Sequence, residues 1–312
     1  MTRALALAAA TISLLAALPA AAQADPPCQP TWKLVKTDVF TGADALIRSQ
    51  GVTPVGDGWV FSWQGGLERT DNAFLPMALG TIAPTLAVSP EVNGDGTNRL
   101  GDNHIGDIDY YNGQIYAPEE DGGENAGVTD INNPEYQFPH IAIYDAQTLA
   151  YTGTNYPLDV ATHEAGVPWV AIDAPHQEVY TAEWDMPHDR LNVFDLTMHF
   201  KRFINLHYGP ELGPHFQLSR IQGAKVLGDT MYATRDDHDK TVFSIDLQTG
   251  AVHRLFSINP TVSAELEGLA VKPMPDGSLL HLLIVMSNDL PNDAQNIHVE
   301  FQHYAPVAPA GC

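Results

Sequence analysis

This sequence places oxygen-bearing side chains at matching points of successive apolar segments. Four of them are good ligands for a hard cation: Asp107, Glu164, Gln222 and Glu267. Carboxylates that meet must be protonated, paired or bridged by a cation, because like charges raise one another's pKa. Calcium suits such a cluster, since it accepts six to eight oxygen ligands. The pattern therefore predicts a Ca²⁺ site at these four residues. The alternative is direct neutralisation of the acids by Arg220, Arg235 and histidines.

Two histidines stand at equivalent points, each just before an apolar segment: His104 and His163. Imidazole is a common general base in enzymes. If neighbouring repeats bring the two rings to one site, either histidine could activate a water molecule there. A structural, hydrogen-bonded role is the alternative for each of them.

A second group of polar residues lies at the end of the next apolar segment in each copy of the pattern. We expect these residues to bind substrate: Glu119, Glu183, Asp185 and Arg235. Arg235 would hold an anionic substrate group or pair with Asp185. The expected partner is a small molecule or a saccharide. The chain lacks the nucleophile-elbow Gly-x-Ser-x-Gly, the phosphate-binding Gly-x-x-x-x-Gly-Lys and the metalloprotease His-Glu-x-x-His, so none of these three sequence signatures assigns a reaction.

The elements that position these residues form a repeat. Four apolar segments are each followed by an aspartate, and these aspartates are 64, 52 and 52 residues apart: Asp121, Asp185, Asp237 and Asp289. A turn and another apolar segment precede each one, and a third segment follows. Three of the third segments end in aspartates that we expect to cap turns: Asp145, Asp195 and Asp246. Repeats of this length with four strands each are typical of a β-propeller.

The repeat count predicts an all-β propeller with five four-stranded blades, and six blades are the alternative. An irregular first copy runs from Gly51 to about Val88, and the last copy lacks a fourth strand. The segment from Trp32 to Phe40 would supply that strand and close the ring. This closure places Cys28 beside Cys312, so we expect a disulfide between them, with two free thiols as the alternative.

Propeller geometry brings the starts of first strands and the ends of second strands to one face, near the axis. The candidate calcium, histidine and substrate residues lie at these positions in the repeat. Loops on a rigid scaffold are also where binding groups collect. The sequence therefore predicts a charged pocket on the axis.

The N-terminal residues fit a secretory signal. Arg3 precedes an apolar run from Ala4 to Leu18 and then small residues, with cleavage expected near Ala24. Residues 25–312 would be one domain, periplasmic or secreted, and we expect a monomer. The formal net charge of −23 repels nucleic acid and anionic membrane surfaces, so neither is an expected partner.

The segments from His104 to Gly113 and from Glu267 to Leu269 resemble parts of exported bacterial β-propeller proteins of uncharacterised function. A weaker similarity is to five-bladed, calcium-dependent nucleotidases of the apyrase type, whose axial calcium ring Glu164, Gln222 and Glu267 would match. The chain is also similar to six-bladed paraoxonase-like lactonases, which carry calcium on the axis with histidine nearby. These resemblances imply a propeller with an axial calcium ion.

The leading hypothesis is an exported, metal-dependent hydrolase of a small ester, lactone or phosphoester. The metal would polarise the substrate while a histidine activates water. One alternative is a polysaccharide lyase or glycosidase, and another is a noncatalytic propeller that binds glycans or proteins, because the fold alone does not choose.

Overall fold

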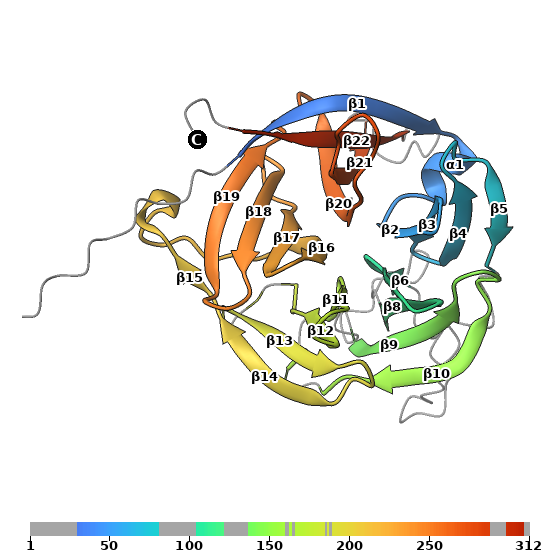
Figure 1. Cartoon of the computed structure of the whole chain (residues 1–312), viewed down its shortest axis with the longest axis horizontal. Coiled ribbons are helices and arrows are strands. Elements are labelled where there is room, and N and C mark those ends of the chain that lie inside the picture. The colour runs from blue at the N-terminus through green and yellow to red at the C-terminus, as the bar shows by residue number, and fades with distance from the viewer. Residues whose placement is uncertain are drawn as a thin grey trace, which may run out of the picture.

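The computed structural model describes residues 30–80, 104–121, 137–159, 162–163, 166–184, 186, 189–287 and 298–308, without the side chains of 121, 137 and 138. These residues form a ring of five antiparallel sheets around a central axis (Figure 1). The prediction of an all-β propeller with five blades is confirmed. Within the described ranges the helical elements are α1 (Ala43–Leu46) and the 3-10 turn η2 (Pro210–Leu212).

In each blade the first strand lies nearest the axis and the fourth lies outermost (Figure 1). Blade 1 consists of β2 (Gly51–Val55), β3 (Gly58–Trp63), β4 (Gly66–Asp71) and β5 (Pro76–Leu79). Blade 2 consists of a divided first strand, β6 (His104–Ile105) and β7 (Asp109–Tyr111), with β8 (Gln114–Asp121), β9 (Gln137–Asp145) and β10 (Tyr151–Pro157). Blade 3 consists of β11 (Ala171–Asp173), β12 (Glu178–Thr181), β13 (Arg190–Asp195) and β14 (Phe200–Asn205).

The remaining strands form blades 4 and 5. Blade 4 consists of β16 (Ile221–Leu227), β17 (Thr230–Arg235), β18 (Thr241–Asp246) and β19 (Ala251–Ser257), and the short β15 (His207–Tyr208) adds in parallel to β19. Blade 5 consists of β20 (Ser263–Val271), β21 (Leu280–Ser287), β22 (His298–Val307) and β1 (Thr31–Thr41).

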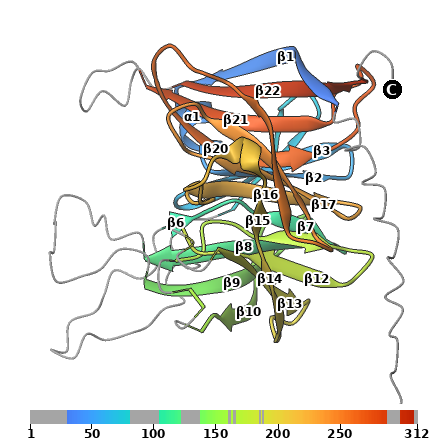
Figure 2. The same cartoon turned by 90° about the vertical axis from the view of Figure 1, so that its left-hand side faces the viewer.

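Strand β1 closes the ring. It pairs antiparallel with β22, with Trp32 opposite Pro306 and Phe40 opposite Val299. Figure 2 shows the two strands side by side at the edge of the molecule. The predicted closure by Trp32 to Phe40 is therefore confirmed, whereas Cys28 and Cys312 lie outside the described residues.

Apolar side chains fill the spaces between neighbouring blades. The described core divides into five clusters, and each cluster joins the facing sides of two adjacent blades. Between blades 5 and 1, for example, Phe40 and Phe301 pack against Phe61, with ring centroids 5.8 and 5.7 Å from that of Phe61. Burial of these side chains, at about 25 cal/mol per Å², holds the blades in the ring.

The first strands of blades 2 and 3 are irregular near the axis. The backbone N–H of Asp107 donates to Pro168 O, and the N–H of Val170 donates to Asp107 O, at 2.9 and 3.0 Å. Asp107 and Trp169 thus form a parallel bridge between blades. The first strand of blade 2 is divided into β6 and β7, and β11 of blade 3 is short, because the two backbones pair with each other near the axis.

Three aspartates cap the turns that end the third strands, as the sequence predicts. Oδ1 of Asp145 accepts hydrogen bonds from the backbone N–H and the hydroxyl of Thr148, both at 2.8 Å. Asp246 bonds Thr249 in the same way, and Asp195 bonds Thr197. These side chains serve the turns and not the axial site.

Candidate functional site

The first strands deviate from regular pairing close to the axis in three blades. The register of β20 against β21 shifts between Leu266 and Leu269, and that of β16 against β17 shifts between Ile221 and Gly223. The first strand of blade 2 is interrupted between β6 and β7. Irregularities of this kind re-aim side chains. The residues at the three points belong to the predicted calcium set: Asp107, Gln222 and Glu267.

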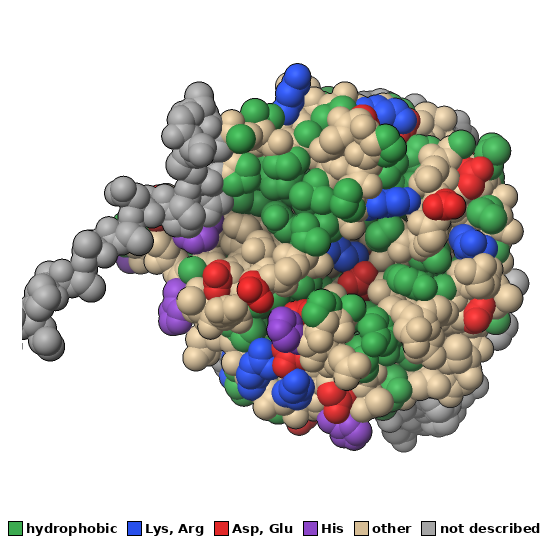
Figure 3. All heavy atoms as spheres, viewed as in Figure 1, with side chains coloured by type: hydrophobic (Ala, Val, Ile, Leu, Met, Phe, Trp, Pro, Cys, Tyr) green, Lys and Arg blue, Asp and Glu red, His purple; other side chains and the backbone are tan. Residues whose placement is uncertain are grey.

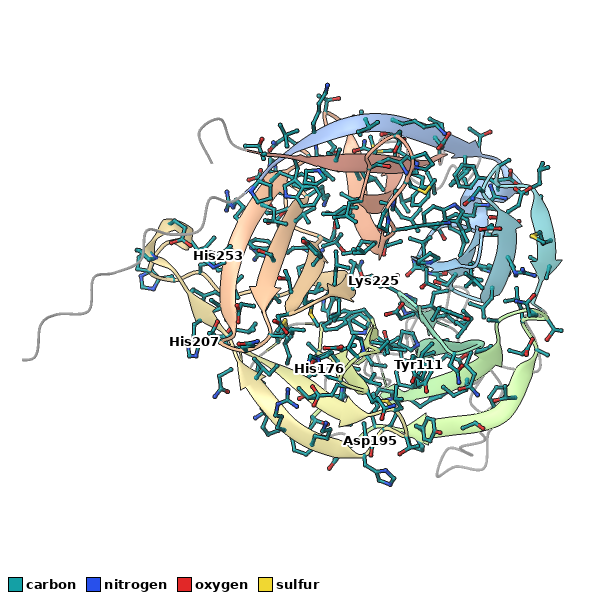
Figure 4. All side chains as sticks on the ribbon, viewed as in Figure 1. Tyr111, His176, Asp195, His207, Lys225 and His253 are labelled. Atoms are coloured by element: carbon teal, nitrogen blue, oxygen red, sulfur yellow. The ribbon has the colours of Figure 1, made fainter. Side chains whose placement is uncertain are left out.

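Asp107 is fully buried at the centre of the ring. Its Oδ1 accepts a hydrogen bond from the backbone N–H of Val52 in blade 1, at 3.0 Å. Its Oδ2 accepts hydrogen bonds from the N–H of Ala224, at 3.2 Å, and from Nζ of Lys225, both in blade 4. Burial raises the pKa of Asp107 to about 7, and Lys225 opposes that shift. Lys225, which Figure 4 places near the centre of the ring, supplies the positive charge that the sequence analysis assigned to calcium.

Three glycines surround the Asp107 carboxylate. A Cβ atom on Gly51 would lie 2.6 Å from the Cα of Asp107, and one on Gly223 would lie 2.7 Å from the Cα of Gly268. Real Cβ atoms do not come so close to backbone, so only glycine fits where these strands converge. The described residues therefore fill the axis at this level.

A polar residue precedes each of these glycines on the chain: Gln50, Gln222 and Glu267. Gln50 directly precedes β2, Gln222 is the second residue of β16, and Glu267 lies within β20 at its register shift. We call the face on which the first strands begin the loop face. The turns between first and second strands lie on the opposite, hairpin face. We call Gln50, His104, Gln222, Glu265 and Glu267 the axial mouth. The sequence analysis missed Gln50, although the repeated pairs Gln50-Gly51, Gln222-Gly223 and Glu267-Gly268 could have revealed it.

His104 links three blades. Its Nδ1 lies 3.2 Å from Oε1 of Glu120, and its Nε2 lies 3.0 Å from Oε1 of Gln50. The other carboxylate oxygen of Glu120 accepts a hydrogen bond from the N–H of Val167 in blade 3. Glu120 is almost fully buried, so it fixes the orientation of the imidazole. A histidine held by a buried carboxylate is an arrangement that suits general-base chemistry.

Glu267 supplies a buried acid on the strand that contacts Gln50. Burial raises its pKa well above the ordinary value, and the nearby carboxylates of Glu265 and Asp236 raise it further. The backbone N–H of the next residue, Gly268, donates to the carbonyl oxygen of Gln50 at 2.7 Å. Gln50 thus contacts both His104 and the strand that carries Glu267.

A network of charges borders the mouth in blade 4. Asp236 is buried and accepts hydrogen bonds from Arg220, at 2.9 Å, and from Lys240, at 2.6 Å. It also accepts one from the N–H of Leu266 in blade 5. Arg220 lies over the ring of Trp184, 5.4 Å from its centroid. Direct pairing with Arg220 and Lys240 therefore neutralises this acid.

His163 is placed differently from His104. It is buried in blade 3, where Nε2 lies 2.7 Å from Oγ1 of Thr181 and Nδ1 lies 2.9 Å from Oγ1 of Thr162. Burial lowers the pKa of His163 to about 3, so the ring stays neutral. These contacts match the structural alternative for His163.

The predicted substrate residues are distributed over several places. Glu119 is buried between β8 and β9, where it accepts hydrogen bonds from Tyr144 and His140. Arg235 donates to the carbonyl oxygen of Ser219 and lies over the ring of Phe216. Glu183 is buried just after β12 in blade 3. Glu164 and Asp185 lie outside the described residues.

The described residues do not make up a calcium site. No group of three or more His, Cys, Asp or Glu side chains among them could hold a metal ion. Asp107 directs both carboxylate oxygens to Lys225 and to backbone N–H groups. In the same parts of the chain, no helix is long and apolar enough to cross a membrane.

Comparisons with known proteins add little to this geometry. No protein-family model matches the chain, and no curated protein matches its sequence. Among solved structures, the PQQ-bound form of an aldose sugar dehydrogenase from Streptomyces coelicolor is similar, with 13% sequence identity and a TM-score of 0.44. The match covers 90% of this chain and 100% of that one.

Proposed function

We propose that the axial mouth is the active site of a hydrolase that acts on a small ester, lactone or phosphoester. The observation that carries this proposal is the Glu120–His104–Gln50 contact, with distances of 3.2 and 3.0 Å at the two ring nitrogens. It lies next to the strand that carries the buried acid Glu267. General acid–base hydrolysis requires a base and an acid whose pKa values are set by different surroundings.

The chemistry follows from the hydrogen bonds. A neutral His104 that donates Nδ1–H to Glu120 has a lone pair at Nε2, so the Gln50 amide must turn its NH2 group toward the ring or give way to water. Nε2 can then take up a proton from that water molecule. The water oxygen bonds to the carbonyl carbon or phosphorus of the substrate as its proton passes to Nε2. The bond to the leaving oxygen then breaks, and protonated Glu267 donates a proton to that oxygen. Gln50 and Gln222 are neutral donors that would orient the polar groups of the substrate.

Calcium binding is a separate proposal, and no step above depends on it. Gln222 and Glu267 would contribute oxygen ligands together with Glu164, whereas Asp107 would not, because Lys225 already pairs with it. Metal analysis of the purified protein, with melting before and after chelation, tests this proposal. One calcium ion per chain and a lower melting temperature after chelation would support it, and no metal with no shift would remove it.

The hydrolase proposal is tested with His104→Gln and Glu267→Gln on panels of chromogenic esters, lactones and phosphoesters. Each variant should lower kcat by about 100-fold or more, the usual contribution of a positioned acid or base. The matched controls are His199→Gln, whose 81% exposed side chain lies in the turn after β13, and Glu211→Gln, whose 53% exposed side chain lies in η2. A wild-type protein without activity, or full activity in both mouth variants, would overturn the proposal.

A further inference from the structure

A second pocket lies between blades 3 and 4. Its volume is about 470 Å³, within the range of small-molecule sites. The turns after β11, β16 and β18 contribute to its walls, together with β12, β14 and β15. These turns belong to the hairpin face, so the pocket lies on the opposite side of the ring from the axial mouth. Figure 4 labels two of its residues, His176 and His207, beside the boundary between the two blades.

Charged side chains in the wall of this pocket are already paired. Glu178 is buried and accepts hydrogen bonds from Arg202, at 2.9 Å, and from the hydroxyl of Tyr180, at 2.8 Å. Asp173 is also buried, and its Oδ2 lies 2.7 Å from Nδ1 of His176. Such internal pairs fix the positions of their polar atoms. Glu178 also accepts from Lys201 and from a second N–H of Arg202, so its acceptor sites are filled, whereas Asp173 keeps lone pairs for further hydrogen bonds.

The charges of the wall alternate in sign. Asp229 and Glu178 would face any anion in the pocket, and Arg202 and His176 would face any cation. Figure 3 shows acidic, basic and histidine side chains interleaved on this part of the hairpin face. A ligand with a full charge of either sign would therefore meet like charge. A neutral ligand with many hydroxyl groups would instead find donors and acceptors on all sides.

Uncharged groups complete the lining. Asn205 of blade 3 and Gln248 of blade 4 are exposed, and these two amide residues line the pocket from its two sides. Phe203, which is 38% exposed, also lines the pocket, and the guanidinium of Arg190 lies over one face of its ring, 3.8 Å from the centroid. Amides next to an aromatic face match the mixed surface of a sugar ring, which carries hydroxyl groups at its edge and C–H groups on its faces.

We propose that this pocket binds a neutral mono- or disaccharide. The site is independent of the proposed hydrolase, because it lies on the other face and shares no residue with the axial mouth.

The test is ligand-observed NMR and calorimetry on the full chain with neutral sugars as probes: glucose, galactose, mannose, maltose and cellobiose. Glucosamine and glucuronate serve as charged analogues. Gln248→Lys would extend an ammonium group across the pocket toward Asp229 and Glu178, and should weaken sugar binding by about tenfold or more. Gln147→Lys is the matched control, since Gln147 occupies the same position in an equivalent Asp-x-x-Thr turn of blade 2.

Binding of at least one neutral sugar that Gln248→Lys weakens and Gln147→Lys does not would support the proposal. His104→Gln should leave this binding unchanged, which separates the pocket from the axial mouth. Three outcomes would overturn the proposal: no binding of any neutral sugar, tighter binding of a charged analogue than of every neutral sugar, or equal effects of the two lysine variants.

Discussion

Lys225 and Asp107 form an ion pair on the axis of the ring, with Nζ 2.5 Å from Oδ2 and both residues buried. One comes from blade 4 and the other from blade 2. The carboxylate also bonds to blade 1, so a single side chain joins three blades at their closest approach. Figure 3 shows basic and acidic side chains together at the centre of the hairpin face, where this axis emerges.

Asp107→Asn should destabilise the protein by about 3 kcal/mol, because it leaves the ammonium group of Lys225 buried without its partner. Lys225→Met should have a similar effect, and the double variant should lose less than the sum of the two. Urea unfolding of all three variants measures this coupling. Lys36→Met, at an exposed pair with Asp38, is the control and should cost less than about 1 kcal/mol. Additive losses in the double variant would show that the pair is not coupled.

Gly223→Ala should destabilise the ring by about 2 kcal/mol or more, because the added methyl group would overlap the backbone of Gly268 in the next blade. Gly80→Ala is a milder change, since the nearest atoms to its Cβ lie at 3.3 Å. Thermal melting compares the two variants. Equal melting temperatures would mean that the strands near the axis can move apart without cost.

Phe40→Ala should cost about 3 to 5 kcal/mol in free energy of unfolding. Its ring is 5% exposed and packs against Phe61, Phe74 and Phe301 at the joint between blades 5 and 1. Val39→Ala, on the same strand with a side chain 55% exposed, should change stability by less than about 0.5 kcal/mol. If both variants unfold at the same denaturant concentration, β1 does not contribute to closure through its buried face.

Glu178→Gln should change how stability depends on pH. Burial alone would raise the pKa of Glu178, but hydrogen bonds from Arg202, Lys201 and Tyr180 outweigh it and lower the pKa from 4.5 to about 2. A depressed pKa contributes stability that is fully present above about pH 4.5 and is lost as pH falls toward about 2. Denaturation at several pH values should show a steeper acid loss in the wild type than in the variant. Parallel curves would contradict this assignment.

The strand that closes the ring could be predicted because a repeat with three strands leaves an unfilled edge. The turn aspartates could be predicted because Asp145 and Asp246, in Asp-x-x-Thr, and Asp195, in Asp-x-Thr, bond within their own turns. The turn pattern is local in sequence, and the missing fourth strand follows from the repeat. His104 at the start of a first strand was placed correctly for the same reason.

The partners of the axial residues could not be predicted in this way. Lys225 reaches Asp107, and Gln50 reaches His104, only because strands from different blades converge at one point. Register shifts at Gln222 and Glu267 then decide which side chains face that point. Side chains alternate along β8, so Glu120 contacts His104 whereas Glu119 contacts Tyr144 and His140 on the other face. A difference of one residue along a strand reverses the face.

The pairing of β1 with β22 also sets an order of events during synthesis. Residues 31–41 leave the ribosome before any blade is complete, yet their partner at 298–307 is made after all the other described strands. Until then β1 has an open edge, and the joint between blades 5 and 1 is unfilled. Contacts over such a long separation are slow to form. A ribosome that stalls before residue 298 would therefore release a chain with an unpaired strand and exposed aromatic rings, which is a target for chaperones and proteases.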